Sequence, residues 1–131
     1  MSESESSHFQ IELHDRVLVI QFISPQLYEH LVLNEVEQEL KEALREYKPR
    51  HVVFDFSNVD FCSSSIISAM LNVRRSIKKS GGSVAIAELK PIVEQAFRVL
   101  GLDSQVFARC ATTKLAVEYL QSLSEDDTVD G

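Results

Sequence analysis

Three consecutive serines, Ser63, Ser64 and Ser65, are the side chains of this 131-residue chain that are best placed for chemistry. They stand where a short apolar stretch ends and a helical pattern begins. The first turn of a helix carries unpaired N–H groups and the positive end of the macrodipole. A serine oxygen there can cap the helix, and a phosphate on a serine is also tolerated, because helix N-termini bind anions. The serines are therefore predicted to cap the helix or to accept a phosphate that changes a binding face without unfolding the core.

The residues around the serines predict the elements that hold them in place. Residues 52–56 indicate a buried strand that only Asp55 interrupts. After the serines, apolar residues recur at the helical period of about 3.6, and Gly81 and Gly82 end that pattern. The serines are thus expected at the carboxyl end of a central strand, where open α/β sheets usually place their sites.

The segment from Asp55 to Ile67 reads Asp-Phe-Ser-Asn-Val-Asp-Phe-Cys-Ser-Ser-Ser-Ile-Ile and resembles the signature of STAS domains, the family of bacterial anti-sigma factor antagonists. The family pattern is roughly Asp-Leu-Ser-x-Val-x-Phe-Met-Asp-Ser-Ser-Gly-Leu. Ser64 falls on the serine that is phosphorylated in this family, and Ser65 matches its neighbour. The resemblance covers most of residues 9–122. It implies an α/β fold with a mixed, mostly parallel sheet, an N-terminal antiparallel hairpin and about four flanking helices.

Two positions depart from the family pattern. Ser63 replaces the usual Asp, which removes a fixed negative charge beside Ser64 and adds a second acceptor hydroxyl. Ile66 replaces the usual Gly and is expected to put a bulky side chain on the surface where a kinase docks.

The resemblance implies a binding module, not an enzyme, that docks an anti-sigma factor with serine kinase activity. Unmodified protein would bind this partner and release a sigma factor. Phosphorylation at Ser64, with Ser63 and Ser65 as alternates, would prevent binding, and a serine phosphatase would reset the switch. The residues expected to bind the partner are Asp55, Asn58, Asp60, Ser63, Ser64, Ser65 and Ile66.

Other readings stay open. A constitutive STAS scaffold subunit of a larger signalling or transporter complex is favoured by the changes at Ser63 and Ile66. A hydrolase or nucleotide-binding enzyme would need a base and a phosphate-binding glycine loop, and the sequence offers neither. Asp55 could accept backbone N–H bonds in the next turn or contact the partner. Cys62 is expected to be buried and not to act as a nucleophile.

Elsewhere, a hairpin followed by alternating helices and strands indicates an α/β fold. The hairpin is expected over residues 9–23, and Asn34 with Glu37 resembles a capping box at the start of the next helix. The later elements are expected to be a strand at 83–87, a helix from Pro91 to Gly101, an edge strand at Val106 and Phe107, and a last helix capped by Thr112 or Thr113. Residues expected to face the core include Tyr47, Leu100, Leu115 and Tyr119. Residues 1–8 and 123–131 are expected to be disordered tails of a single domain at 9–122.

The net charge of −7 argues against binding to nucleic acid or to an anionic membrane, because both need a basic face. No apolar run approaches the roughly 20 residues that span a bilayer, and the acidic N-terminus is unlike a signal peptide. Cys62 and Cys110 are predicted to be small buried side chains in a reducing compartment. The four histidines lack the spacing of a metal site. We therefore expect a cytoplasmic protein without metal or cofactor, a monomer or weak dimer.

Overall fold

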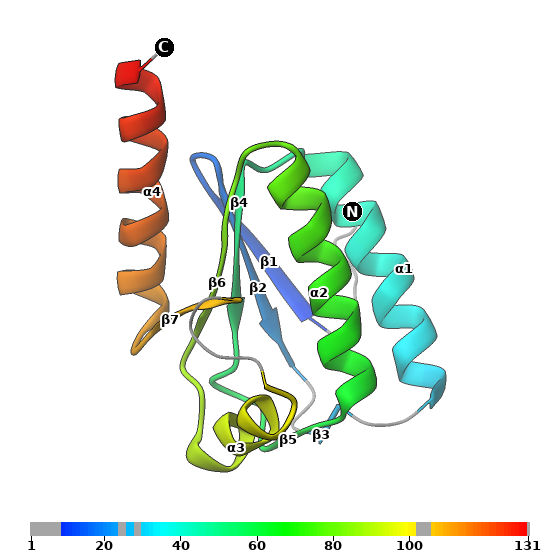
Figure 1. The fold of residues 1–131 in the computed structure, drawn as a ribbon. Coiled ribbons are helices and arrows are strands. Elements are labelled where there is room, and N and C mark those ends of the chain that lie inside the picture. The colour runs from blue at the N-terminus through cyan, green and yellow to red at the C-terminus, as the bar shows by residue number, and fades with distance from the viewer. Residues whose placement is uncertain (1–8, 24–25, 28–29, 102–105, 131) are drawn as a thin grey trace.

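The computed structural model of the chain describes residues 9–23, 26–27, 30–101 and 106–130. Within these residues, four helices accompany a five-stranded sheet and a separate two-stranded sheet (Figure 1). In chain order the elements are β1 (Phe9–His14), β2 (Val17–Phe22), β3 (Gln26–Leu27), α1 (His30–Tyr47), β4 (His51–Asp55), β5 (Phe61–Cys62), α2 (Ser64–Lys79), β6 (Val84–Ala87), α3 (Pro91–Val99), β7 (Ala108–Cys110) and α4 (Thr113–Asp130).

The large sheet has the strand order β1-β2-β4-β6-β7. β1 and β2 pair antiparallel through a tight turn in which Asp15 has a φ of 61°, and all the other neighbours in this sheet are parallel. This arrangement confirms the predicted mixed, mostly parallel sheet with an opening hairpin. The central strand is β4, whose five residues are all buried.

Each face of the sheet has its own core, because alternate residues of a strand point to opposite sides. Leu18, Phe54 and Ile86 belong to the core covered by α1, α2 and α3, whereas Val53 and Ala85 belong to the core under α4. Figure 1 shows α1 and α2 together on one side of the sheet and α4 on the other. The core on the α4 side of the sheet consists mainly of valine and alanine side chains. Helix α4 therefore contacts the sheet through a narrow strip of its surface.

A chain of phenylalanine rings runs through the larger core. Phe22 stacks on Phe54 at a centroid distance of 5.9 Å and meets Phe56 edge to face at 5.4 Å. Phe56 meets Phe97 of α3 at 5.9 Å, and Phe97 meets Phe107 at 6.1 Å. Aromatic pairs of this kind contribute about 0.5–1.5 kcal/mol each beyond their buried area. The rings therefore tie α3 and the segment before β7 to the carboxyl end of β4.

Several element boundaries differ from the predicted ones. α1 begins at His30, so Asn34 lies inside the helix and the predicted capping box is wrong. The last strand is at 108–110, where Ala108 pairs with Ala85, and it is an edge strand as predicted. Val106 and Phe107 precede it, because the Phe107 side chain is used in the core packing against Phe97.

At the acidic end of the chain, α4 continues to Asp130, through most of the segment 123–131 for which a disordered tail is predicted. No glycine or proline lies between Thr113 and Asp130 to end the helix. The predicted disorder of residues 1–8 falls outside the described part of the chain.

In three helices, fewer side chains are buried in the core than the sequence predicts. Tyr47, Leu100, Leu115 and Tyr119 were expected to face the core, yet each is more than a third exposed. In α4, the fully buried Ala116 and Leu120 fill the space against the sheet. Among the helices of the described ranges, none combines the length and apolar character needed to cross a bilayer.

Candidate functional site

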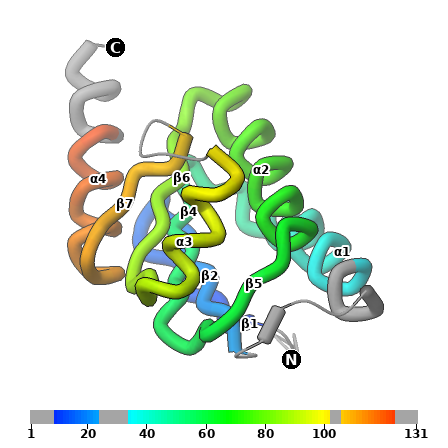
Figure 2. Tube along the Cα trace, turned by 60° about the horizontal axis from the view of Figure 1, so that its bottom comes forward, coloured from blue at the N-terminus to red at the C-terminus, as the bar shows by residue number. Residues whose placement is uncertain are grey.

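The serine cluster lies beyond the carboxyl end of β4, as predicted from the sequence. After Asp55, the amide of Phe56 donates to the carbonyl of Ala87 at 3.0 Å and prolongs the pairing with β6. The amide of Val59 then donates back to the carbonyl of Phe56 at 3.0 Å and closes the turn. β5 follows, pairs in parallel with β3 and leads directly into α2. Figure 2 shows this segment passing between α3 and the start of α2.

Ser63 is the N-cap of α2. Its backbone is extended, with φ −83° and ψ 161°, and its Oγ accepts the amide of Ile66 at 3.4 Å. The carbonyl of Ser63 accepts the amide of Ile67 at 3.2 Å, which is the first bond of the helix. An N-cap serine is worth about 1 kcal/mol of stability. The predicted capping role of Ser63 is confirmed.

Ser64 and Ser65 occupy the first turn of α2, and both are exposed. No acidic residue lies in this turn, so a negative group placed there meets the positive end of the helix without a neighbouring repulsive charge in the same turn. Both hydroxyls can be reached from solvent by a modifying enzyme.

Ile66 was expected on the docking surface, and this expectation is wrong. The residue is only 1% exposed and belongs to the same core cluster as Val59, Cys62 and Met70. The first turn of α2 directs the side chain at this position toward the sheet, so the replacement of Gly adds apolar packing and no surface bulk. It therefore leaves the exposed face of Ser64 and Ser65 unchanged.

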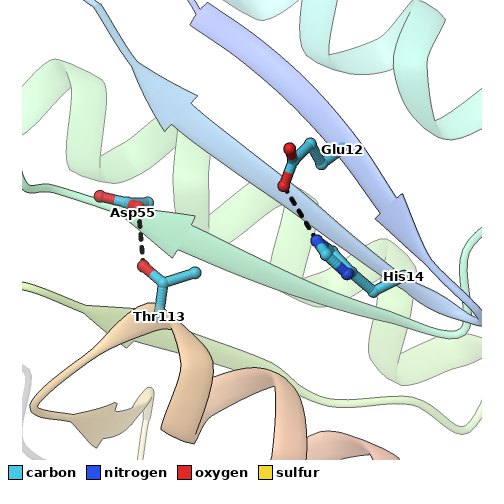
Figure 3. A network of polar contacts seen from close by, with 4 residues as sticks. All are labelled: Glu12, His14, Asp55 and Thr113. Carbon is cyan, nitrogen blue, oxygen red and sulfur yellow. Dashed lines mark hydrogen bonds and ion pairs between the residues drawn. The ribbon is translucent and has the colours of Figure 1, made fainter.

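Asp55 is buried and both of its carboxylate oxygens accept hydrogen bonds. Oδ1 accepts the amide of Ser57 at 2.8 Å, and Oδ2 accepts the hydroxyl of Thr113 at 2.7 Å. Figure 3 shows the second bond, which joins the end of β4 to the start of α4. The sequence left two roles open for Asp55, namely to accept backbone N–H bonds in the next turn or to contact the partner. These hydrogen bonds support the first role.

Two residues that the sequence reasoning missed, Glu88 and Gln21, extend this network. The Glu88 carboxylate accepts the amide of Thr113 at 2.8 Å, and Gln21 donates to the hydroxyl of Ser57 at 3.0 Å. Glu88 has a φ of 64°, a left-handed conformation that is uncommon outside glycine. Of the two threonines predicted to cap the last helix, Thr112 is the capping residue of α4, since its hydroxyl accepts the amide of Leu115 at 3.1 Å. A signal was available in the sequence, because parallel strands end at one edge of a sheet, which brings together the residues at the carboxyl ends of β2, β4 and β6.

Asn58, Asp60 and Phe61 lie on the exposed surface next to the serines. Asp60 forms an ion pair with Lys90, the N-cap of α3, at 2.5 Å. Phe61 is 51% exposed and was not among the predicted partner-binding residues. A large aromatic side chain that is half exposed is a feature that protein interfaces often use.

Cys62 is buried, and burial raises the pKa of its thiol to about 12. Its Sγ lies 3.6 Å from the carbonyl of Ser63 as a weak donor. Since the thiolate is the nucleophile, a thiol that stays protonated near neutral pH is unsuited to covalent catalysis. The prediction of a small buried side chain is confirmed for Cys62, whereas Cys110 is only partly buried.

The raised pKa of Cys62 predicts a specific loss of stability at alkaline pH. The folded state favours the neutral thiol, so its stabilisation is present below the ordinary pKa of 9.0 and is lost as pH rises from about 9 toward about 12. Relative to a Cys62→Val variant, the free energy of unfolding of the unmodified chain should fall by about 1.4 kcal/mol between pH 8 and pH 10. Urea unfolding at both pH values measures this difference. An identical pH dependence of stability in the two proteins would show that burial does not raise the pKa of the Cys62 thiol.

Comparison with known proteins identifies the class. The family model described as STAS domain matches residues 8–118, and the chain therefore belongs to the STAS domain family. A curated relative, the "Anti-sigma F factor antagonist" of Paenibacillus polymyxa, is 28% identical over 96 residues, which cover 72% of this chain and 81% of the relative.

Solved structures show the same fold. An anti-sigma-factor antagonist (STAS) domain protein from Planctomyces limnophilus has a TM-score of 0.77 at 21% identity, over 88% of this chain and 99% of that one. The anti-sigma factor antagonist SpoIIAA in its unphosphorylated form has a TM-score of 0.74 at 21% identity, over 87% and 96%. All three of these proteins are named as antagonists of anti-sigma factors. In the part of the chain described, no group of three or more His, Cys, Asp or Glu side chains could hold a metal ion.

Proposed function

We propose that this STAS domain is an anti-sigma factor antagonist, which binds an anti-sigma factor through the surface around Ser64 and loses that binding when Ser64 is phosphorylated. The observation that carries this proposal is the exposure of Ser64 in the first turn of α2, on a helix that Ser63 already caps. The name of the curated relative supports the partner class, and the naming of SpoIIAA in an unphosphorylated form supports the regulation.

Ser64 is preferred over its two neighbours for physical reasons. The oxygen of Ser63 accepts a helix amide, so phosphorylation there would disturb the cap. Ser64 also matches the phosphorylated position of the STAS signature. A phosphoserine carries a charge of about −1.5 to −2 at neutral pH, and the helix N-terminus favours it. The modification would alter the docking surface while the scaffold stays in place.

The two departures from the family signature are compatible with this switch. Ser and Asp are both favourable N-cap residues, so Ser63 keeps the cap that Asp would provide. Ile66 is buried, so it cannot obstruct a kinase. The constitutive scaffold was favoured by surface changes at these two positions, and that support is weaker once Ile66 packs in the core.

The contact surface that we propose consists of exposed residues at the start of α2 and in the preceding loop, namely Asn58, Asp60, Phe61, Ser64 and Ser65. Asp55 and Ile66 act from below, by fixing the loop and the helix, and do not touch the partner. The partner is a serine-kinase anti-sigma factor, with a serine phosphatase as the resetting enzyme. Such a regulator of transcription acts in the cytoplasm.

The test is to incubate the protein with a serine-kinase anti-sigma factor from the same organism and ATP, and to locate the phosphate by mass spectrometry. We expect one phosphate on Ser64, no incorporation into Ser64→Ala, and normal incorporation into the control Ser122→Ala on α4. Phosphate found outside residues 63–65, or none at all, would contradict the proposed switch.

Phe61 is expected to anchor the complex. Partly exposed aromatic residues at interface centres often carry 2 kcal/mol or more of binding energy, which corresponds to a roughly thirtyfold change in Kd. Phe61→Ala should therefore raise the Kd for the unphosphorylated complex by at least about tenfold in calorimetry. Tyr119→Ala is the matched control, because Tyr119 is 44% exposed on α4 away from this surface. Equal effects of the two variants would contradict the placement of the interface.

A further inference from the structure

A groove of about 830 Å³ opens at the end of the domain opposite Ser64. Its walls are the β1–β2 turn, the carboxyl ends of α1 and α2, and the connection from α1 to β4. Figure 1 shows these parts gathered at one end of the sheet, while the start of α2 lies at the other. The volume lies within the range of about 300–1,000 Å³ that is usual for small-molecule sites.

The charge of this groove is opposite to that of the chain. Among the described residues that line it, five are basic and Asp15 is the one acidic residue, although the whole chain has a net charge of −7. The basic residues are Arg16, Lys41, Arg45, Lys48 and Arg50. Within the described residues, no ion pair involves Arg16, Lys41, Arg45 or Lys48. The hydroxyls of Ser76 and Ser80 add further polar groups to the lining.

Neutralisation of helix dipoles accounts for only part of this cluster. Basic residues are favourable near a helix carboxyl end, which explains Arg45 and Lys48 at the end of α1. Arg50 donates to the carbonyl of Gly81 at 3.3 Å beyond the end of α2. Arg16 lies in the hairpin turn and Lys41 lies well before the last turn of α1, so the dipole explains neither.

Lys48 occupies a position where a lysine is unfavourable for the fold. Its φ is 46°, a left-handed conformation that glycine or asparagine normally adopts at the end of a helix. Its amide donates to the carbonyl of Leu44 at 3.0 Å, as expected for such a helix end. A glycine would make the same backbone bond with less strain, so the end of the helix does not by itself account for a lysine here, and the charged side chain lies beside the groove.

We propose that this groove binds a small, multiply charged anion that carries phosphate or carboxylate groups. A small anion inside the groove meets mainly the local basic residues, since charges further away are screened over about 8 Å at physiological salt. An extended polyanion would also meet the acidic remainder of the surface, which disfavours nucleic acid and anionic bilayers. This binding is independent of the switch at Ser64, because the two sites lie at opposite ends of α2.

The test uses isothermal calorimetry on the full chain at 150 mM NaCl, with inorganic tripolyphosphate in one arm and citrate in the other. We expect saturable binding of at least one anion, and a Kd at least tenfold higher for the double variant Arg16→Gln/Lys41→Gln. The control is Arg75→Gln/Lys114→Gln, which removes the same charge at exposed positions outside the groove. Its Kd should stay within twofold of the unmodified protein.

A second variant separates binding from folding. Lys48→Gly should leave the thermal unfolding midpoint unchanged or higher, while it weakens anion binding at least threefold. Absence of binding by both anions, equal weakening in groove and control variants, or binding of phosphatidylserine vesicles without binding of either anion would overturn the proposal. None of these outcomes depends on whether Ser64 is phosphorylated.

Discussion

Replacing Ser64 by aspartate should weaken binding to the anti-sigma factor by about a hundredfold or more and leave the folded domain intact. The side chain is exposed in the first turn of α2, where an acidic group is compatible with the helix dipole, so stability should change by less than about 1 kcal/mol. At the interface, an added charge that is desolvated or faces a like charge costs several kcal/mol, and about 2.7 kcal/mol already corresponds to a hundredfold change in Kd.

The two parts of this prediction are measured separately. Calorimetry gives the Kd for the partner, and urea unfolding gives the stability of the same preparation. Ser122→Asp is the matched control, because Ser122 is an exposed serine on α4, away from the start of α2. Binding by Ser64→Asp that equals that of the control would remove Ser64 from the interface.

The second large effect is a loss of stability, and it concerns Phe56 in the core beneath the serine cluster. Phe56 is fully buried directly after Asp55, and its ring contacts those of Phe22 and Phe97. Phe56→Ala should lower the free energy of unfolding by about 3–5 kcal/mol, since it removes buried area and leaves a cavity between the sheet and α3. Urea unfolding followed by circular dichroism measures the loss.

Phe61 provides the comparison for this result, five residues further along the chain. It is half exposed, so Phe61→Ala should cost less than about 1 kcal/mol of stability while it weakens partner binding. The two phenylalanines would then separate the roles of core and interface within one loop. Equal stability losses in the two variants would contradict the packing described for Phe56.

Local signals allowed much of the fold to be predicted from the sequence. The start and end of α2 follow from Ser63 as N-cap and from Gly81, whose φ of 85° favours glycine. Pro91 at the start of α3 and the hairpin of β1 and β2 are likewise set by neighbouring residues. These features need no knowledge of distant parts of the chain.

The helical spacing of Ile66, Met70, Val73 and Ile77 is consistent with the buried position of Ile66, whereas the comparison with a family pattern that has Gly there led to the wrong expectation of a surface side chain. Features that depend on distant partners were missed. The carboxylate of Asp55 bonds to Thr113, which lies 58 residues later. No local pattern indicated that α1 begins at His30 or that β3 pairs with β5. In the site, the exposed hydroxyls were predictable, whereas the network that holds their loop was not.

The most direct measurement is the affinity of one anti-sigma factor for this protein before and after stoichiometric phosphorylation at Ser64, with a third titration after phosphatase treatment. We predict tight binding, then binding at least a hundredfold weaker, then full recovery, with circular dichroism spectra that superimpose in all three states. Equal affinity of the phosphorylated and unmodified forms would contradict a switch at Ser64, and weakening accompanied by unfolding would contradict a change confined to the surface.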